Sequence, residues 1–348
     1  MNAVLTLAQA AEKAVTTAQN DGGILHSFGF LLAIKIAGVL LVFLTVPLVV
    51  GMIEHKGMAH MQSRMGPMYA GGFHGWAQLV ADGIKFVQKE DVVPDNADRW
   101  VFKLAPAVSL LPAMFVLVVI PVGPDIVAEP LDIGLFYALA ISSITVIGML
   151  MAAWSSANKF SLLGGIRGAA QLIAYELPLI LSAVSVVILS GTLSLTGIAH
   201  AWRWWWLVAL APAIFIFFTS SLAELNRPPF DMPVADSEII FGHMTEYTGL
   251  RFALFLLTEY AGIVVAGGLM TAMFFGGWRG PGPDFLDPVW TLVKVMAVGF
   301  VVVWLRATYP RLREDQLQKF CWKALIPLAL VQVLAVSALK VFVMHGNL

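Results

Sequence analysis

Acidic side chains are concentrated in one short stretch of an otherwise apolar sequence. The stretch LAELNRPPFDMPVADSEI, residues 222–239, contains Glu224, Asp231, Asp236 and Glu238, together with Arg227. Burial can raise a carboxyl pKa by about 3–5 units from its ordinary value near 4.3. A desolvated acid can therefore exchange a proton near neutral pH. These residue types at this density indicate proton transfer, or a negative surface whose protonation follows what binds beside it.

Two more glutamates stand inside apolar segments. Glu176 lies in RGAAQLIAYELPLILSAV, and Glu259 lies in ALFLLTEYAGIVVAGGL. Translocon scales give a charged residue at the centre of a membrane helix a cost of about 2.5–3.5 kcal/mol. We therefore expect these side chains to face protein or water, or to be neutral. The alternative is purely structural, with the acids serving as partners of Arg227, Lys35 or Lys294.

Three prolines constrain the backbone of the acidic stretch. Pro228, Pro229 and Pro233 exclude a continuous helix, so we expect extended and turn conformations there. Irregular backbone at membrane depth is tolerated only where protein or water covers it. The stretch is therefore expected to pack against helices.

Membrane helices are the elements that must position these acids. The 348 residues are 59% hydrophobic and 12% charged, whereas soluble domains have roughly 45–50% apolar and about 25% charged residues. A helix needs about 20 mainly apolar residues to cross the hydrocarbon. The sequence predicts an all-α polytopic membrane protein with about eight transmembrane helices, at 28–53, 101–123, 133–154, 172–190, 205–225, 252–275, 289–305 and 324–344.

Lysine and arginine predict the orientation, because cytoplasmic loops carry an excess of them. Of the 21 such residues, fifteen fall in alternate loops or at their borders, four fall on the opposite side, and Lys35 and Lys294 fall inside spans. Both termini are therefore expected outside. Residues 1–27 have no apolar core typical of a signal peptide. The predicted organisation is an external segment 1–27 and an eight-helix membrane domain 28–348 with cytoplasmic loops 54–100, 226–251 and 306–323.

The first of these loops contains a different kind of helix. In HGWAQLVADGIKFVQKE, apolar side chains recur at helical spacing, and polar side chains take the other face. The apolar set is Trp76, Leu79, Val80, Ile84 and Val87. This pattern predicts an amphipathic helix at the membrane surface. The helix either anchors the loop or forms the floor of a binding site that an amphiphilic, lipid-soluble substrate enters from the bilayer.

Other chemistries are disfavoured by the residue inventory. Cys321 is the only cysteine, so the chain cannot hold an iron–sulfur cluster through four thiolates. A net charge of −1 argues against nucleic-acid binding. Neither a phosphate loop nor a paired-histidine metal motif is evident. Any redox centre is therefore expected in a partner, and no metal or cofactor is expected on this chain.

Five stretches together resemble the family of H subunits of bacterial NADH:quinone oxidoreductase, respiratory complex I. The resemblance runs from about residue 46 to residue 327. The stretches are EHKGMAHMQSRMGP (54–67), QLVADGIKFVQKE (78–90), RGAAQLIAYELP (167–178), LAELNRPPFDMPVADSEI with TEYTGLRFALFLLTEY (222–260), and RATYPRLREDQLQKFCWKALIP (306–327).

The resemblance implies that the chain builds most of a quinone cavity and couples quinone reduction to proton translocation. The bound substrate would be ubiquinone or menaquinone. Flavin and iron–sulfur clusters would belong to hydrophilic-arm subunits, including the one holding the terminal cluster. Small membrane subunits and antiporter-like subunits would adjoin it in the bacterial cytoplasmic (inner) membrane. By the same resemblance, the residues that couple quinone reduction to proton movement would be Glu176, Glu224, Asp236, Glu238, Glu246 and Glu259. The residues of the quinone cavity would be Glu54, His55, Arg64, Asp82, Lys85, Arg227, Asp231 and Arg306.

Several positions depart from the family pattern. His55 stands where the family usually has arginine, Val234 where it has the first of three alternating glutamates, Met68 where it has asparagine, and Glu314 where tyrosine is common. Three other functions remain open from the sequence. They are the related membrane subunit of an energy-converting nickel–iron hydrogenase, a stand-alone cation/proton exchanger, and a purely structural anchor.

Overall fold

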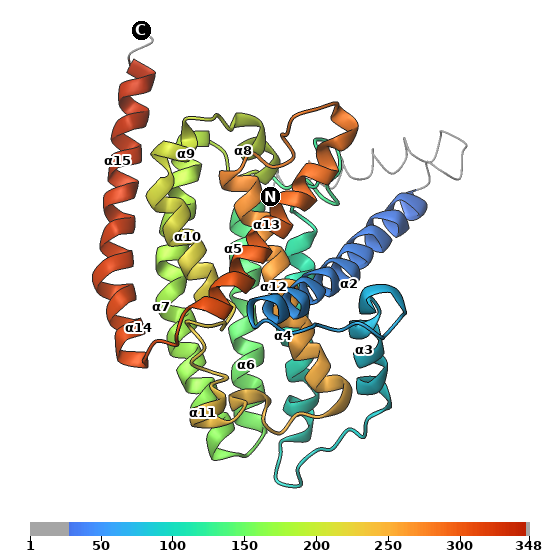
Figure 1. The fold of residues 1–348 in the computed structure, drawn as a ribbon. Coiled ribbons are helices and arrows are strands. Elements are labelled where there is room, and N and C mark those ends of the chain that lie inside the picture. The colour runs from blue at the N-terminus through green and yellow to red at the C-terminus, as the bar shows by residue number, and fades with distance from the viewer. Residues whose placement is uncertain (1–27, 346–348) are drawn as a thin grey trace.

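The computed structural model describes residues 28–345, and within that range every regular element is a helix (Figure 1). Side chains are described except at Phe28, Asp236 and residues 343–345. The expected external segment 1–27 lies outside the described residues. The all-α prediction is confirmed for the described range.

Seven helical segments within residues 28–345 are long and apolar enough to cross a membrane. They make the chain a multi-pass membrane protein. Three of them are composite: α5 and α6 follow one another almost without a break, η4 (Asp284–Leu286) runs directly into α13, and α14 continues through a π-helical turn, η5 (Cys321–Leu325), into α15. The helices are α2 (Phe28–Met61), α4 (Arg99–Leu117), α5 (Gly134–Ser142) with α6 (Ile144–Ser155), α7 (Lys159–Ser190), α12 (Gly249–Phe274), α13 (Asp287–Thr308), and α14 (Glu314–Phe320) with α15 (Ile326–His345).

The expected span 205–225 forms two shorter helices, α9 (Trp206–Ala209) and α10 (Ala211–Glu224). Fourteen residues of α-helix extend about 21 Å, less than the roughly 30 Å of hydrocarbon. Pro212 lies in the first turn of α10, where its missing N–H is tolerated. The helix ends at Glu224, which places that acid at a helix end next to the proline-rich loop.

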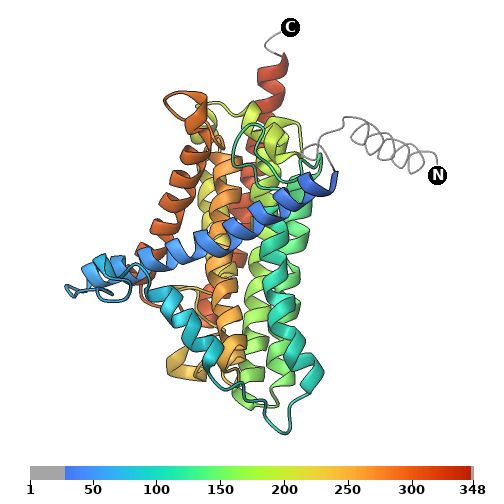
Figure 2. The same ribbon diagram turned by 90° about the vertical axis from the view of Figure 1, so that its right-hand side faces the viewer.

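Helix α2 crosses the bundle obliquely (Figure 2). It is 34 residues long and continues to Met61, eight residues beyond the predicted span. Its last turns therefore bring Glu54 against α12 and α13, which pack on α2. Helix α7 is also longer than predicted, because Asn158 caps it before Lys159: the Asn158 side chain accepts a hydrogen bond from the Phe160 N–H.

The predicted amphipathic helix is present as α3 (Gln78–Gln88), packed beside α2 and α12. Leu79 faces Gly51 of α2, and the Phe86 ring lies 5.9 Å from that of Phe252 on α12. Val80 and Ile84 are exposed. Of the predicted apolar face, Leu79 is thus used for internal packing, while the rest faces outward, including Trp76 and Val87.

The proline-rich loop between α10 and α12 follows turns and two short helices, α11 (Asp236–Ile239) and η3 (Gly242–Met244), as the prolines predict. Gln171 of α7 holds its start: the amide Nε2 lies 2.6 Å from the Ala223 carbonyl and 2.8 Å from the Phe230 carbonyl. The Leu312 N–H donates to the Pro229 carbonyl at 3.0 Å. The first part of the loop is therefore covered by protein, whereas Ser237, Glu238, Ile240 and Phe241 are exposed.

Short elements complete the described chain: η2 (Phe73–Gly75) before α3, α8 (Leu195–Ala201) after α7, and η4 (Asp284–Leu286) before α13. The main core lies where α4, α7, α10 and α12 meet, and the rings of Phe217 and Phe274 are 5.6 Å apart there. This packing fixes α10 and α12, which carry two of the candidate acids.

Candidate functional site

A buried cluster of charged residues joins four elements of the fold. Arg227, from the proline-rich loop, pairs with Glu54 of α2, and its Nε lies 2.6 Å from Glu259 Oε1 of α12. Arg306 of α13 pairs with the other oxygen of Glu54. The Arg227 guanidinium also lies over the Tyr260 ring, 4.9 Å from its centroid. Four predicted site residues, far apart in sequence, are thus brought into one cluster.

Burial makes this cluster electrostatically demanding. The side chains of Arg227 and Glu54 are each 1% exposed, and a buried charge is costly unless it is paired. Burial opposes the charge on Arg227, yet Glu259 and Glu54 together raise its pKa above the ordinary value. Arg227 therefore stays protonated and is shared between the two carboxylates. A change in the charge of either acid therefore alters the electrostatic environment of the other through this guanidinium.

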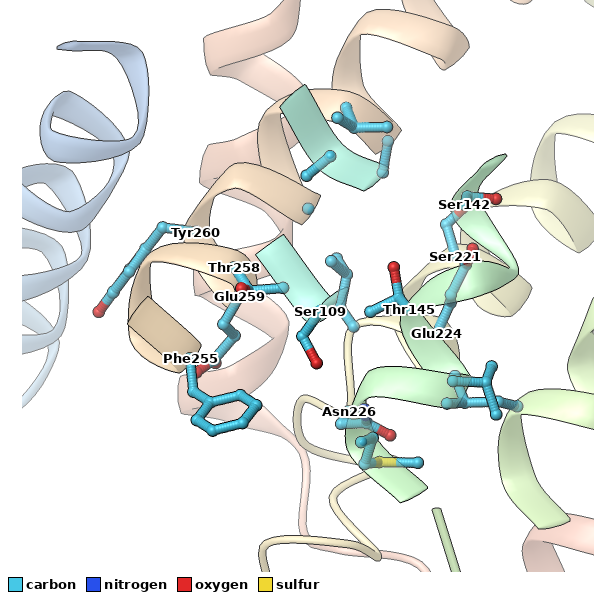
Figure 3. A pocket seen from close by; sticks show the side chains of 18 of the residues that line it. Ser109, Ser142, Thr145, Ser221, Glu224, Asn226, Phe255, Thr258, Glu259 and Tyr260 are labelled. Carbon is cyan, nitrogen blue, oxygen red and sulfur yellow. The ribbon is translucent and has the colours of Figure 1, made fainter. Parts of the chain in front are cut away.

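A cavity of about 290 Å³ lies next to the cluster and is lined from α4, α6, α10, α12 and the proline-rich loop. Glu224 and Glu259 lie on opposite sides of it, with Ser109 and Thr145 between them (Figure 3). Its volume suits on the order of ten water molecules. Asp231 and Arg306 also line it. Most of the lining is apolar, and the cavity places two membrane acids along one space.

A second, smaller cavity continues from Glu224 to Glu176. It has a volume of about 20 Å³ and is lined by both glutamates together with Ser142 and Tyr175. A space of that size suffices for one water molecule. Glu224 lines both cavities. Glu259, Glu224 and Glu176 thus line two neighbouring cavities that share Glu224.

Two polar atoms of the larger cavity have no hydrogen-bond partner in the described protein, Ser109 Oγ and His243 Nδ1. Buried polar atoms are rarely left without a partner, and water fits a space of this kind. His243 lies in η3 and is 6% exposed. Burial lowers its pKa to about 4. Sequence reasoning missed His243, because a single histidine in a loop has no diagnostic spacing.

The remaining acids of the proline-rich loop lie in different environments, some at the cavity and some away from it. Asp231 lines the cavity, whereas Glu238 lies 2.6 Å from Arg167 and 3.3 Å from Arg311 in an exposed ion-pair network. A hydrogen bond from Arg167 holds the pKa of Glu238 below its ordinary value. Glu246 accepts a hydrogen bond at 2.5 Å from Asn158, the cap of α7. The backbone of Asp236 begins α11, and its side chain is not among those described.

The candidates in the first loop form a separate polar group on α3. Lys85 Nζ lies 3.2 Å from Asp82 Oδ1, and Gln78 donates to the same carboxylate at 3.0 Å. Arg64 is exposed and donates to Gln62 at 2.7 Å, and His55 is half-buried on α2 next to Glu54. The structure thus connects Glu54, Arg227 and Arg306 directly, and connects α3 to them through packing on α2 and α12.

The two lysines inside predicted spans are not partners of the membrane acids. Lys35 pairs with Glu129 at 3.3 Å on the surface. Lys294 donates to three backbone carbonyls at the end of α12, those of Phe275, Gly277 and Arg279. Lys294 also borders an apolar hollow of about 1120 Å³ near α8 and α9. Of Arg227, Lys35 and Lys294, the three cations considered as partners of the membrane acids, only Arg227 pairs with one of those acids.

Comparison with known proteins identifies the family. The family model described as NADH dehydrogenase matches residues 34–337. The chain belongs to the NADH dehydrogenase family. The NADH-quinone oxidoreductase H subunit of Bacillus cytotoxicus is 44% identical over 293 residues, which cover 82% of this chain and 87% of the relative. The H 2 subunit of the same enzyme from Syntrophobacter fumaroxidans is 45% identical over 322 residues, covering 89% and 96%. The H subunit from Dehalococcoides mccartyi is 44% identical over 292 residues, covering 84% and 81%.

The NADH dehydrogenase match includes every residue of the buried cluster and of the two cavities. The resemblance stated for the sequence is therefore confirmed at the level of the family.

Proposed function

We propose that this chain is a membrane subunit of a proton-translocating NADH:quinone oxidoreductase, in which it forms the quinone-binding cavity and couples quinone reduction to proton movement. The observation that carries the proposal is the shared guanidinium of Arg227. It joins Glu54, which Arg306 also holds, to Glu259, which lines the larger cavity. The names of the similar proteins support the same enzyme class.

The quinone side of the proposed site lies where α2, α3 and α13 approach one another. An exposed apolar face on α3 suits an amphiphilic substrate arriving from the bilayer. Arg306 is 35% exposed and provides a cation near the path of the head group. In this proposal Asp82, Lys85, His55 and Arg64 border the entrance, and ubiquinone or menaquinone is the bound substrate.

The proposed coupling is electrostatic. Reducing a quinone to a quinol takes two electrons and two protons, so charge changes beside Arg306 during turnover. Arg306 and Arg227 hold the same Glu54 carboxylate. When one arginine is drawn toward new negative charge, its hold on Glu54 weakens, and the balance of Arg227 between Glu54 and Glu259 shifts. The proton affinity of Glu259 then changes, and the cavity transmits the change to Glu224 and Glu176.

The enzyme's other parts follow from this assignment. Flavin and iron–sulfur clusters lie in partner subunits of the hydrophilic arm, and small and antiporter-like membrane subunits continue the proton path. We place the loops 54–100, 226–251 and 306–323 on the cytoplasmic side of the bacterial inner membrane, with both termini outside. The exposed network of Glu238, Arg167 and Arg311 suits docking of the hydrophilic arm.

The test is Glu224→Gln in the assembled enzyme, in inverted membrane vesicles supplied with NADH. We expect at least a fivefold loss of coupled quinone reduction with the complex still assembled on native gels, because the variant interrupts both cavities. Glu129→Gln is the matched control, since Glu129 is an exposed partner of Lys35 outside both cavities. Normal proton pumping per quinone in Glu224→Gln would refute the coupling role.

A further inference from the structure

One titratable side chain of the larger cavity has no part in the function proposed above. His243 is contributed by η3, which packs against α6 and α7. Its ring lies 5.5 Å from that of Phe255 in an edge-to-face contact, and both line the cavity. The Nδ1 atom is buried and has no hydrogen-bond partner in the described protein. An imidazole with an unused nitrogen is thus held at the wall of the cavity that Glu224 and Glu259 share.

The backbone holds this imidazole in place closely. Gly242, which precedes it, has φ +53, and a Cβ on Gly242 would lie 1.7 Å from the Pro233 carbonyl oxygen. A Cβ on Gly164, in the second turn of α7, would lie 2.7 Å from the Gly242 Cα. The residue before His243 is therefore clamped between Pro233 of the same loop and the first turns of α7. This puts His243 at the loop end of the cavity, whereas Ser142 marks the part of the cavity nearest the middle of the α5–α6 segment.

The charged groups around His243 suit a proton path. Of the helices packed against it, α6 has no titratable side chain, and α7 carries Lys159, Arg167, Tyr175 and Glu176. The titratable and charged groups that share the cavity with His243 are Glu224, Asp231, Glu259, Tyr260 and Arg306. Burial, without a neighbouring charge, accounts for the low pKa of His243. A neutral ring offers one N–H donor and one acceptor nitrogen at once.

We propose that His243 relays protons between water at the loop end of the cavity and the carboxylates Glu224 and Glu259. A proton from a hydronium binds the unprotonated ring nitrogen while the N–H on the other nitrogen gives its proton to the next water. The entering hydronium becomes water and the accepting water becomes hydronium, so one proton enters and one leaves, and the ring then returns by a rotation that exchanges its two nitrogens. The inference rests on the proposed function, because it supplies the cavity acids with protons.

The test uses the assembled enzyme in inverted vesicles, with NADH-driven quinone reduction and proton uptake measured together. His243→Phe keeps an aromatic ring against Phe255 and removes both nitrogens. We expect at least a fivefold loss of coupled turnover. His243→Gln retains polar atoms but cannot relay a proton by tautomer change, so we expect the same loss of coupled turnover. If the His243→Phe complex fails to assemble, the result for His243→Gln decides whether the relay exists.

Rescue separates a relay from a packing role. Val234 lines the same cavity from the same loop. Adding Val234→Glu to His243→Phe supplies a new proton-carrying group there, and we expect it to restore at least half of the coupled turnover. His200→Phe is the control, because His200 lies on α8, stacked edge-on against Trp278 outside the cavity.

The outcomes are distinct. Full coupling in His243→Phe or His243→Gln would overturn the relay, and so would failure of Val234→Glu to restore an assembled His243→Phe enzyme. A wild-type complex without quinone reductase activity would instead remove the proposed function itself. Loss in both histidine variants with rescue by Val234→Glu supports the relay.

Discussion

Arg227 Nε lies 2.6 Å from Glu259 Oε1, while the same guanidinium pairs with Glu54. The relationship connects the proline-rich loop to two helices that are far apart in sequence. Arg227 and Glu54 are each 1% exposed, so bulk solvent cannot take the place of their pairing, whereas Glu259 is 26% exposed. Through Arg227, the loop therefore links the proposed quinone side to the larger cavity both structurally and electrostatically.

Replacing Arg227 with methionine should be severely destabilising. The change leaves Glu54 and Glu259 without their shared cation, and breaking a buried ion pair typically costs about 3–5 kcal/mol. We expect a markedly lower melting temperature of the purified enzyme, or loss of the assembled complex. The triple variant Glu54→Gln, Glu259→Gln, Arg227→Met should recover much of that stability without activity. A melting temperature for Arg227→Met equal to that of wild type would contradict the ion cluster.

Asn158 and Glu246 should be energetically coupled. The 2.5 Å hydrogen bond between them connects the start of α7 to the proline-rich loop. Asn158→Ser retains a capping oxygen but is too short to keep this bond, so its effect should vanish when Glu246 is already alanine. A double-mutant cycle on melting temperature should show an interaction of about 0.5–1.5 kcal/mol. Simple additivity would mean that Glu246 serves another role.

Much of the fold could be predicted because membrane spans leave a strong compositional signal. The prolines after Glu224 also predicted correctly that no continuous helix follows, and the first part of the loop is covered as expected, whereas residues such as Glu238 are exposed. The division of the span 205–225 into α9 and α10 left little signal, since both parts are equally apolar and Pro212 is tolerated in a first helical turn.

Pairing within the site was less predictable. The sequence offered Arg227, Lys35 and Lys294 as partners for the membrane acids, and only tertiary packing selects Arg227. The oblique course of α2 brings Glu54 to α13, and no local pattern encodes that angle. Glu238 and Glu246 lie in the same loop as the cavity acid Asp231, yet they pair with Arg167 and Asn158 instead.

Acidification should destabilise the enzyme partly through His243. Its pKa is about 4 in the folded chain and 6.5 in the unfolded one, so the unfolded chain binds the proton first as the pH falls. Stability is unaffected above pH 6.5 and decreases between pH 6.5 and 4, by at most about 3 kcal/mol from this group. Melting temperatures at pH 7.5, 6 and 5 should therefore fall less in His243→Phe than in wild type. Parallel pH profiles for the two proteins would show that His243 is not buried in the neutral form.

Gly242→Ala should disrupt the proline-rich loop more than any exposed glycine substitution. Gly242 has φ +53, which alanine adopts only with strain, and the new Cβ would meet the Pro233 carbonyl oxygen at 1.7 Å. Backbone would have to move, which displaces His243 from the cavity wall. We expect a melting temperature lower by several degrees and coupled quinone reduction reduced at least fivefold. Gly83→Ala on α3 is the matched control: nothing lies within 4 Å of its Cβ, and alanine should stabilise an exposed helix position by up to about 1 kcal/mol. If Gly242→Ala behaved like Gly83→Ala, the clamp on the residue before His243 would have to be abandoned.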